Sequence, residues 1–597
     1  MTKQDTAQAG EEQTWLLAYA VGPVSDFVAA ARRMRDFWYG SRLLSELCQH
    51  AAGRAQQLGG TLVFPSLEVP ITRVDSAAWL PNRGAVIWRG PEPAGLARAL
   101  RKAVDQRLSR LSGAALRTFL KDLPDEYPTD ELINVDWYRS QIKGLPEFYA
   151  AWVRCDNPED PDAYRSAYQR LQRELLARKR TRDFLRVRAT EPAGHPKSAL
   201  DASRPSVLER TYLSECAAHQ RRLGIEGDPL DAPGLLKRVL GRRERFPAVT
   251  RVAIDPWVRR LAAIDNHSLH DLGVAFEAVR TAQPDLVSAS RPHESGFEFD
   301  GQLLLTDRLN LARAVAQTHA CKALSRLQEL RQRAIKLVGE PDPYLALMAV
   351  DLDHFGERLW QSDLAGQTAL ARLAAGFARA SALVARKASG FVIHGGGDES
   401  LIMLPLPAAL DCAEQLHQHL NQLPDAQRMG VTVSIGVSMA HALTPLRRLR
   451  EQALGALRLA KLGERPGDEA RDALAVVAQP RAGGEIRVRV KWSTAGALTG
   501  SARLATWQAA FESGSLPRTA PHALRAGQQL CRFDRALSAA ALRRFEQRRR
   551  VGGGPAGWLN AGVAAISDPA MGTEDASKQL VSEWLLARWL SARGQVI

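Results

Sequence analysis

The chain has 597 residues, 45% of them hydrophobic, with 80 Lys and Arg residues against 65 Asp and Glu residues, a formal net charge of +15. That length predicts three or four domains, and the hydrophobic share is ample for packed cores, which excludes a fibrous or largely disordered chain. A large basic protein commonly binds nucleic acid or an anionic lipid, although a general bias towards Ala and Arg gives the same excess.

The sequence indicates neither a membrane protein nor an oxidising compartment. No apolar run appears long enough to cross a bilayer, and the polar first thirteen residues contain no signal-peptide core. The six cysteines are scattered singly without a CxxC pair, so we expect no disulfide framework and no zinc. We therefore expect a cytoplasmic protein without a membrane partner.

The first part of the chain reads as a mixture of strands and helices. Apolar patterning and turn residues predict these elements. They are the strands Trp15–Val21, Thr61–Phe64 and Ala85–Trp88 and the helix Pro93–Leu111. Breaks rich in Pro and Gly follow near 191–196 and 224–233 and indicate a separate middle segment.

The segment from 344 to 461 alternates in the order β-α-β-β-α-β, which is typical of a split βαβ, ferredoxin-like unit. Its first helix is indicated by apolar residues at Leu370, Leu373, Phe377 and Val384, and its second by those at Ala409, Cys412, Ala413, Leu416 and Leu420. Its strands are expected at Tyr344–Ala349, Phe391–His394, Leu401–Leu404 and Val431–Ser438, and a helix at Pro445–Lys461 follows.

Two acidic tips end strands of this unit. Asp351 and Asp353 follow the first strand, and Gly395–Glu399 joins the strands of the hairpin. In this topology the two tips can lie side by side, and their carboxylates can then hold two Mg²⁺ ions that activate a hydroxyl and neutralise a leaving pyrophosphate. Glycines let the backbone approach a triphosphate. This is the layout of a palm-type nucleotidyltransferase or nucleotide cyclase, although a glycine-acidic turn alone is more often a plain hairpin turn.

Several motifs carry a resemblance to a known family. Val350-Asp-Leu-Asp-His-Phe-Gly356, Gly396-Gly-Asp-Glu399 and Val433-Ser-Ile-Gly-Val437 resemble the palm of GGDEF-type cyclases. With Arg35-Asp-Phe-Trp-Tyr-Gly-Ser41 and Pro81-Asn-Arg83, the order of motifs from about residue 15 to about residue 480 is similar to the large subunit of type III CRISPR–Cas effector complexes of the Cmr (type III-B) kind.

The resemblance implies an α+β fold with two ferredoxin-like palm domains, an intervening mixed domain and a C-terminal helical domain. We expect a disordered tail at 1–14, a catalytically silent palm-like domain at 15–185, a mixed linker domain without zinc at 186–335, an active palm at 336–480 and a helical domain at 495–597.

The resemblance also implies an activity and its partners. Such subunits polymerise ATP into a cyclic oligoadenylate, or attach AMP to another small molecule, when the complex binds target RNA. The implied partners are guide RNA, target RNA and the other type III subunits, including the small helical subunit. Two alternatives remain: a catalytically silent structural subunit, and a free-standing nucleotide cyclase.

The site residues follow from matching these motifs. Asp351, Asp398 and Glu399 are the expected catalytic residues, with Asp351, Asp353 and Asp398 as ligands of Mg²⁺ or Mn²⁺. The expected nucleotide contacts are Gly395, Gly396, Gly397, Ser434, His441 and Lys461. Lys461 can equally be a surface lysine at a helix end, and Ser434 a buried strand residue.

The chain departs from the family pattern in three places. The first strand begins by Trp15, which leaves no room for the HD nuclease domain of many relatives, so we expect no DNase activity. Pro196–Asp201 has serine where relatives carry a zinc-binding cysteine. Glu399 stands where a second aspartate is usual, which keeps the charge but lengthens the side chain.

Overall fold

The structure is a computed structural model that describes residues 13–67, 80–181, 194–242, 246–288, 296–462, 470–481, 483–492, 500–530, 540 and 573–594. Of the expected tail at 1–14, residues 1–12 lie outside the described residues. The chain divides into two compact units. The first joins Met1–Glu244, His354–Arg379 and Ile393–Glu399, and the second joins Arg245–Asp353, Ala380–Val392 and Ser400–Ile597.

The first unit contains a four-stranded sheet in the order β2-β3-β1-β4. Its strands are β1 (Thr14–Gly22), β2 (Thr61–Phe64), β3 (Arg83–Arg89) and β4 (Glu147–Arg154). Helix α2 (Met34–Gln57) separates β1 from β2, and the helix predicted at 93–111 is longer, α3 (Ala94–Leu120). All three strand pairs are antiparallel. This pairing and the strand order together are those of a ferredoxin-like unit.

The first unit also contains shorter helices in its N-terminal part. They are α1 (Ser25–Ala29), α4 (Thr129–Leu132), α5 (Val135–Lys143), α6 (Pro161–Arg180), α7 (Arg210–Glu215), α8 (Ala217–Leu223) and α9 (Ala232–Gly241). Helix α6 packs on β1 and β4, and Leu16, Tyr164 and Leu171 belong to the core between them. The buried Arg238 binds Asp36 at 2.8 Å and so ties α9 to the first turn of α2.

The second unit begins with a group of helices. They are α10 (Val249–Ile264), α11 (Asn266–Ala282), α12 (Thr306–Val315) and α13 (Thr318–Val338), with the 3₁₀ turns η1 (Pro284–Leu286) and η2 (Gln302–Leu304). One apolar core with Trp257, Phe276 and Leu327 joins these helices. Packing of this kind buries one face of each helix.

The second sheet has six strands in the order β10-β9-β8-β5-β7-β6. They are β5 (Tyr344–Leu352), β6 (Phe391–Gly395), β7 (Glu399–Pro405), β8 (Val433–His441), β9 (Ala473–Ala478) and β10 (Ile486–Lys491). Helices α15 (Leu364–Lys387) and α16 (Ala409–Gln422) complete the predicted β-α-β-β-α-β order. The α+β class with two ferredoxin-like units is confirmed. The strands β9 and β10, which were not predicted, extend the sheet beyond β8.

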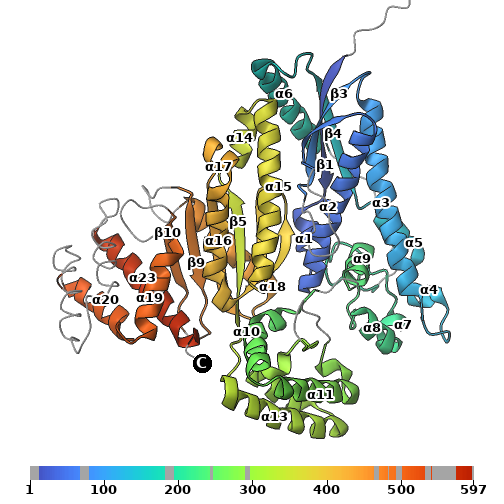
Figure 1. Ribbon diagram of the computed structural model, residues 1–597. Coiled ribbons are helices and arrows are strands. Elements are labelled where there is room, and N and C mark those ends of the chain that lie inside the picture. The colour runs from blue at the N-terminus through green and yellow to red at the C-terminus, as the bar shows by residue number, and fades with distance from the viewer. Residues whose placement is uncertain are drawn as a thin grey trace, which may run out of the picture. The chain divides into compact units, whose positions relative to one another are not determined.

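The remaining helices follow the strands of the second sheet. They are α14 (Phe355–Gln361), η3 (Leu406–Ala408), α17 (Pro424–Met429), α18 (Leu446–Leu462), α19 (Gly500–Glu512), α20 (Ala520–Leu530) and α23 (Thr573–Gly594). Figure 1 shows α19, α20 and α23 grouped together, and α19 and α23 also pack against β10.

Helix α15 differs from one expectation. Among the described residues it is the one helix long and apolar enough to cross a membrane by length and composition, although no such run was expected. Leu370, Leu373 and Phe377 on α15 are buried within the protein. A core helix has this composition because its apolar side faces other elements rather than lipid, so the composition of α15 alone is weak evidence for a membrane.

Helix α18 lies unusually close to β8. A Cβ atom on Gly436 of β8 would be 2.0 Å from the backbone N of Leu457 in α18. The α18 side chains nearest the sheet are small and buried, namely Ala453, Ala456 and Ala460. Because the two backbones touch at a glycine, the position of α18 along the sheet is fixed.

We expect Gly436→Ala to destabilise the protein by about 2–3 kcal/mol, because backbone atoms cannot move aside as a flexible side chain can. Gly455→Ala in the same helix is the matched control, since a Cβ there meets only the end of Arg458 at 3.9 Å. That control should stabilise the helix by about 0.5–1 kcal/mol. Urea unfolding of both variants measures the difference, and equal stabilities would contradict the close contact.

Candidate active site

Asp351 lies on the second sheet, near the end of β5. The strand runs on to Leu352, so Asp351 is a strand residue rather than part of the turn predicted after Ala349. It pairs with Ser434 of the antiparallel strand β8. Its carboxylate lies 2.6 Å from Nζ of Lys461, near the end of α18. The lysine that was predicted to contact phosphate therefore lies against an expected metal ligand.

Asp353 follows the end of β5 and is completely buried. Oδ1 accepts a hydrogen bond from the Ser434 hydroxyl at 2.7 Å, and Oδ2 accepts one from the Thr432 hydroxyl at 2.8 Å. Oδ2 also accepts the backbone N–H of Asp472 at 3.0 Å. Both oxygens thus accept hydrogen bonds from the protein, and such bonds offset the cost of burying a polar side chain.

The loop that supplies one of these donors has an unusual backbone. Arg471 and Asp472 have φ angles of 62° and 44°, in the left-handed region that side chains other than glycine rarely adopt. The Arg471 N–H donates to the carbonyl oxygen of Lys461 at 2.9 Å. The carbonyl oxygen of Arg471 accepts a hydrogen bond from Lys491 Nζ at 2.8 Å. These bonds hold the loop before β9 against the end of α18.

An aromatic pair lies under the same loop. The indole of Trp492 stacks on the imidazole of His417, with ring centroids 4.4 Å apart, and donates to the carbonyl oxygen of Val433 at 3.0 Å. Burial lowers the pKa of His417, with an opposing contribution from the Asp472 charge. A neutral ring is suited to stacking in such an apolar place.

Two predicted nucleotide contacts lie elsewhere than expected. Ser434 is fully buried and bonds to Asp353, so it serves as the buried strand residue that was the alternative. His441 pairs with Tyr344 at the start of β5, seven strand residues, or about 23 Å, from Asp351. Burial and then the Arg481 charge lower the pKa of His441. The structure therefore does not bring His441 to the aspartates.

The glycine-rich tip belongs to the first unit. The Gly396 N–H donates to the Glu399 carbonyl oxygen at 3.0 Å, and the Asp398 N–H donates to the Gly396 carbonyl oxygen at 3.1 Å. Gly397 has a φ of 81°, which favours glycine. Glu399 is exposed, whereas Gly395 is buried. The Gly396 amide is thus engaged in the turn.

A histidine that the motif analysis did not single out lies beside this tip. His394 Nδ1 is 2.5 Å from the hydroxyl oxygen of Ser41 on α2. A Cβ on Gly396 would lie 4.0 Å from Nε2 of His394. The imidazole therefore lies next to the turn, in a position set by Ser41. The proximity of residues 353 positions apart gave no signal in the sequence.

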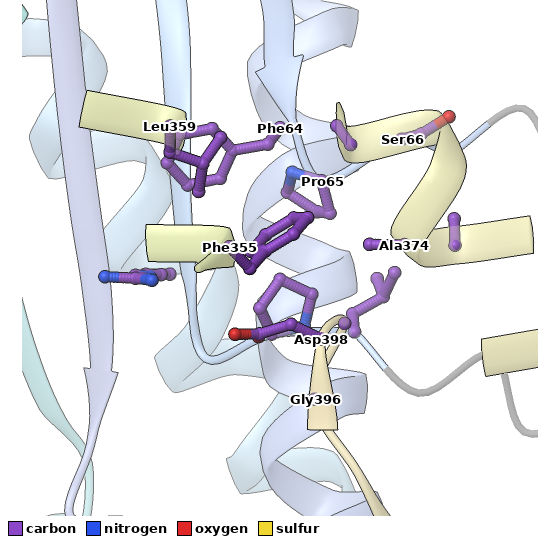
Figure 2. Close-up of a pocket in the computed structure, with 14 residues that line it drawn as sticks. Phe64, Pro65, Ser66, Phe355, Leu359, Ala374, Gly396 and Asp398 are labelled. Atoms are coloured by element: carbon purple, nitrogen blue, oxygen red, sulfur yellow. The ribbon is translucent and has the colours of Figure 1, made fainter. Parts of the chain in front are cut away.

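The tip also borders a mostly apolar pocket, all of whose lining residues belong to the first unit. Figure 2 shows Phe355 between Pro65 and Asp398, with Leu359 and Phe64 beside it. The enclosed cavity has a volume of about 40 Å³ and opens to solvent at its mouth. Arg83 is its one basic lining residue, and it belongs to the Pro81-Asn-Arg83 motif.

The residues fit a metal site in part. Among the described residues no group of three or more His, Cys, Asp or Glu side chains is arranged to hold a metal. Carboxylate oxygens are the ligands that Mg²⁺ and Mn²⁺ prefer, and Asp351 and Asp398 both carry them. Asp353 does not fit, because it is completely buried, both of its oxygens accept hydrogen bonds from the protein, and the Arg471 cation lies 3.9 Å from Oδ1.

Comparison with known proteins agrees with this architecture. The Cas10/Cmr2 second palm domain matches residues 344–475, and the N-terminal domain of the CRISPR-associated protein Cmr2 matches residues 16–113. The expected resemblance to the Cas10/Cmr2 large subunits is confirmed. A CRISPR system Cmr subunit Cmr2 from Pyrococcus furiosus is 22% identical over 522 residues, which cover 73% of this chain and 59% of that protein. The chain thus spans less than two thirds of that relative.

Two solved structures of a type III-B Cmr-beta complex contain similar chains. One is the apo state, with a TM-score of 0.67 and 12% identity over 98% of this chain and 82% of that chain. The other is bound to cognate target RNA, with a TM-score of 0.66 and 11% identity over 98% and 83%. At these identities the likeness shows a shared fold.

The tip generates a matched pair of substitutions. Gly397→Ala should destabilise the turn by about 1–2 kcal/mol, because alanine is strained at a positive φ. Gly396→Ala is the control, since its Cβ would enter space with only His394 at 4.0 Å. Hydrogen exchange of the peptide 391–405 should quicken about tenfold in Gly397→Ala alone. Equal exchange in both variants would count against the turn as described.

Proposed function

We propose that this chain is the large subunit of a type III CRISPR RNA-guided antiviral complex and polymerises ATP into a cyclic oligoadenylate or a related adenylylated messenger. The observation that carries the proposal is the strand order. The strand β7, which begins at Glu399, lies next to β5, which carries Asp351, within the segment that matches the Cas10/Cmr2 palm. That order supports acidic groups from both tips acting together.

Asp351 and Asp398 are the residues that would hold Mg²⁺ or Mn²⁺, with Glu399 as the third acid. The bound metal would polarise the α-phosphate and stabilise the departing pyrophosphate. Lys461 would leave Asp351 and neutralise a phosphate of ATP. Asp353 is not proposed as a ligand, in contrast to the expectation from the sequence.

The pocket beside the tip suits a nucleoside. The Phe355 ring and the apolar side chains around it offer a surface on which a purine can stack, and Arg83 offers a cation for a phosphate or hydroxyl. Since the enclosed part of the pocket is small, the base would rest at its open mouth rather than in a closed cavity.

The proposed partners follow from the family. They are guide RNA, target RNA and the other type III subunits, including the small helical subunit, and the proposed location is the cytoplasm. The net charge of +15 supports contact with RNA phosphates. In the complex, binding of target RNA would switch on ATP polymerisation.

A catalytically silent structural subunit is the second candidate. The pairing of Lys461 with Asp351 favours it, because an ion pair at 2.6 Å competes with a metal for the same carboxylate oxygen. The two candidates are separated by incubating the assembled complex with ATP, Mg²⁺ or Mn²⁺ and matched target RNA. Mass spectrometry of the products then identifies a messenger or its absence.

Asp351→Ala and Asp398→Ala should each reduce product formation by at least about 100-fold, because water does not replace a carboxylate that would hold the metal ion. The matched control is Asp411→Ala, an exposed acid on α16 of the same sheet unit. The complex should assemble with all three variants. Undiminished product from Asp351→Ala or Asp398→Ala would refute the assignment.

Glu399→Gln should reduce product formation by about 10–100-fold, because loss of a charge weakens a site for a hard cation. Glu399→Asp should be tolerated or improve turnover, since it restores the acid usual in the family. Rates of wild type and both variants are compared over Mg²⁺ and Mn²⁺ titrations with target RNA. If Glu399→Gln matches wild type, Glu399 serves only the turn.

A further inference from the structure

We infer that Asp353 is a positioning residue that sets the place of Lys461 through the 471–472 loop, and that it is not a metal ligand. The inference deepens the proposed function and rests on it only in taking Lys461 as the group that meets phosphate. It concerns the second unit alone, to which Asp353, Lys461 and the loop all belong.

Two hydrogen bonds and one ion pair, linked by the covalent chain of the 471–472 loop and Lys461, join the two aspartates. Asp353 Oδ2 accepts the N–H of Asp472 at 3.0 Å, and the neighbouring Arg471 N–H donates to the Lys461 carbonyl oxygen at 2.9 Å. The side chain of the same lysine lies 2.6 Å from Asp351. Asp353 thus influences the position of the Lys461 ammonium group beside Asp351, through the backbone of residues 471 and 472.

The loop needs this support because its backbone is strained. Two successive non-glycine residues of this loop have a positive φ. Such a backbone conformation is strained, by an amount typical of functional sites, and it persists only when other contacts hold it. The carboxylate of Asp353 supplies one such contact, and the ammonium group of Lys491 supplies another at the Arg471 carbonyl oxygen. The Arg471 guanidinium, 3.9 Å from Asp353, adds a favourable charge.

Metal binding by Asp353 would break this arrangement. A cation on Oδ2 would displace the Thr432 hydroxyl at 2.8 Å or the Asp472 N–H at 3.0 Å. A cation on Oδ1 would lie beside the Ser434 hydroxyl and face the positive charge of Arg471, 3.9 Å from Oδ1. Asp353 has no exposed surface, while Asp351 is 8% exposed. Displacing a buried donor leaves it unsatisfied, which is costly. The two aspartates of the Asp-Leu-Asp motif therefore have different roles. Asp351 would act at the reacting phosphate, and Asp353 holds the loop that positions Lys461.

Lysine reactivity in the full-length chain tests the inference without any assay of activity. In Asp353→Asn the amide nitrogen would face at least one donor, so the loop should loosen. Acylation of Lys461 and Lys491, read by mass spectrometry, should then rise about fivefold, the population change that one lost hydrogen bond brings. Lys336 on α13, exposed and outside the network, is the internal control. Unchanged labelling of Lys461 would overturn the inference.

Manganese binding separates positioning from ligation. With a non-hydrolysable ATP analogue, Asp353→Asn should bind Mn²⁺ within about twofold of wild type, whereas Asp351→Asn should bind it at least about tenfold more weakly. Equal weakening in the two variants would make Asp353 a ligand and overturn the inference. If wild type binds no Mn²⁺, the proposed function fails, while the labelling result still decides the role of Asp353.

Two gentler variants keep the test informative if Asp353→Asn does not fold. Thr432→Val and Ser434→Ala each remove one hydroxyl that donates to Asp353 and leave the carboxylate in place. Both should raise labelling of Lys461 and the KM for ATP more than they lower kcat. In combination with Lys461→Met, neither should raise KM further, because the lysine through which they act is gone. Additive effects would show an independent role.

Discussion

The contact between α18 and β8 is the constraint on which the candidate site depends. Because Gly436 lets the two backbones touch, α18 has one permitted position along the sheet. The end of that helix carries Lys461, whose side chain meets Asp351 and whose carbonyl oxygen meets the 471–472 loop. The absence of a side chain at Gly436, in the middle of β8, therefore determines where the positive charge of Lys461 lies. The position of the Lys461 charge beside Asp351 thus depends on packing within the sheet that is remote from both residues.

The polar groups behind Asp351 show how a sheet can hold a charged site. Asp353, which follows β5, bonds to the residue before β8 and to the loop before β9, so the end of β5 and the starts of β8 and β9 share one set of hydrogen bonds. All of its partners are fixed by strand pairing or by backbone. These bonds hold the carboxylate of Asp353 in one position.

Much of the fold was predictable from the sequence. The strands at 61–64 and 391–394 and the helices on either side of the hairpin were found because apolar residues recur with the period of each element. The strand β9 was missed because Ala473–Ala478 is a continuous run of small apolar residues, which has no period. The role of Asp353 was also beyond reach, since its donors Thr432 and Asp472 lie 79 and 119 positions away. The distance between His441 and Asp351, in contrast, follows from the predicted topology. Because β8 runs antiparallel to β5, His441 at the end of β8 lies beside the start of β5, whereas Asp351 lies near the end of β5.

The two unpredicted strands protect the palm sheet from its own edge. Without them β8 would present a row of unpaired N–H and C=O groups, which invites pairing with another chain. β9 covers β8 and β10 covers β9, and α19 and α23 pack on β10. A fragment cut at residue 480, the predicted end of the palm, would keep its acidic residues but lose β10 and expose β9. Such a fragment would be prone to aggregation, so the residues from 481 onward matter to the solubility of the palm.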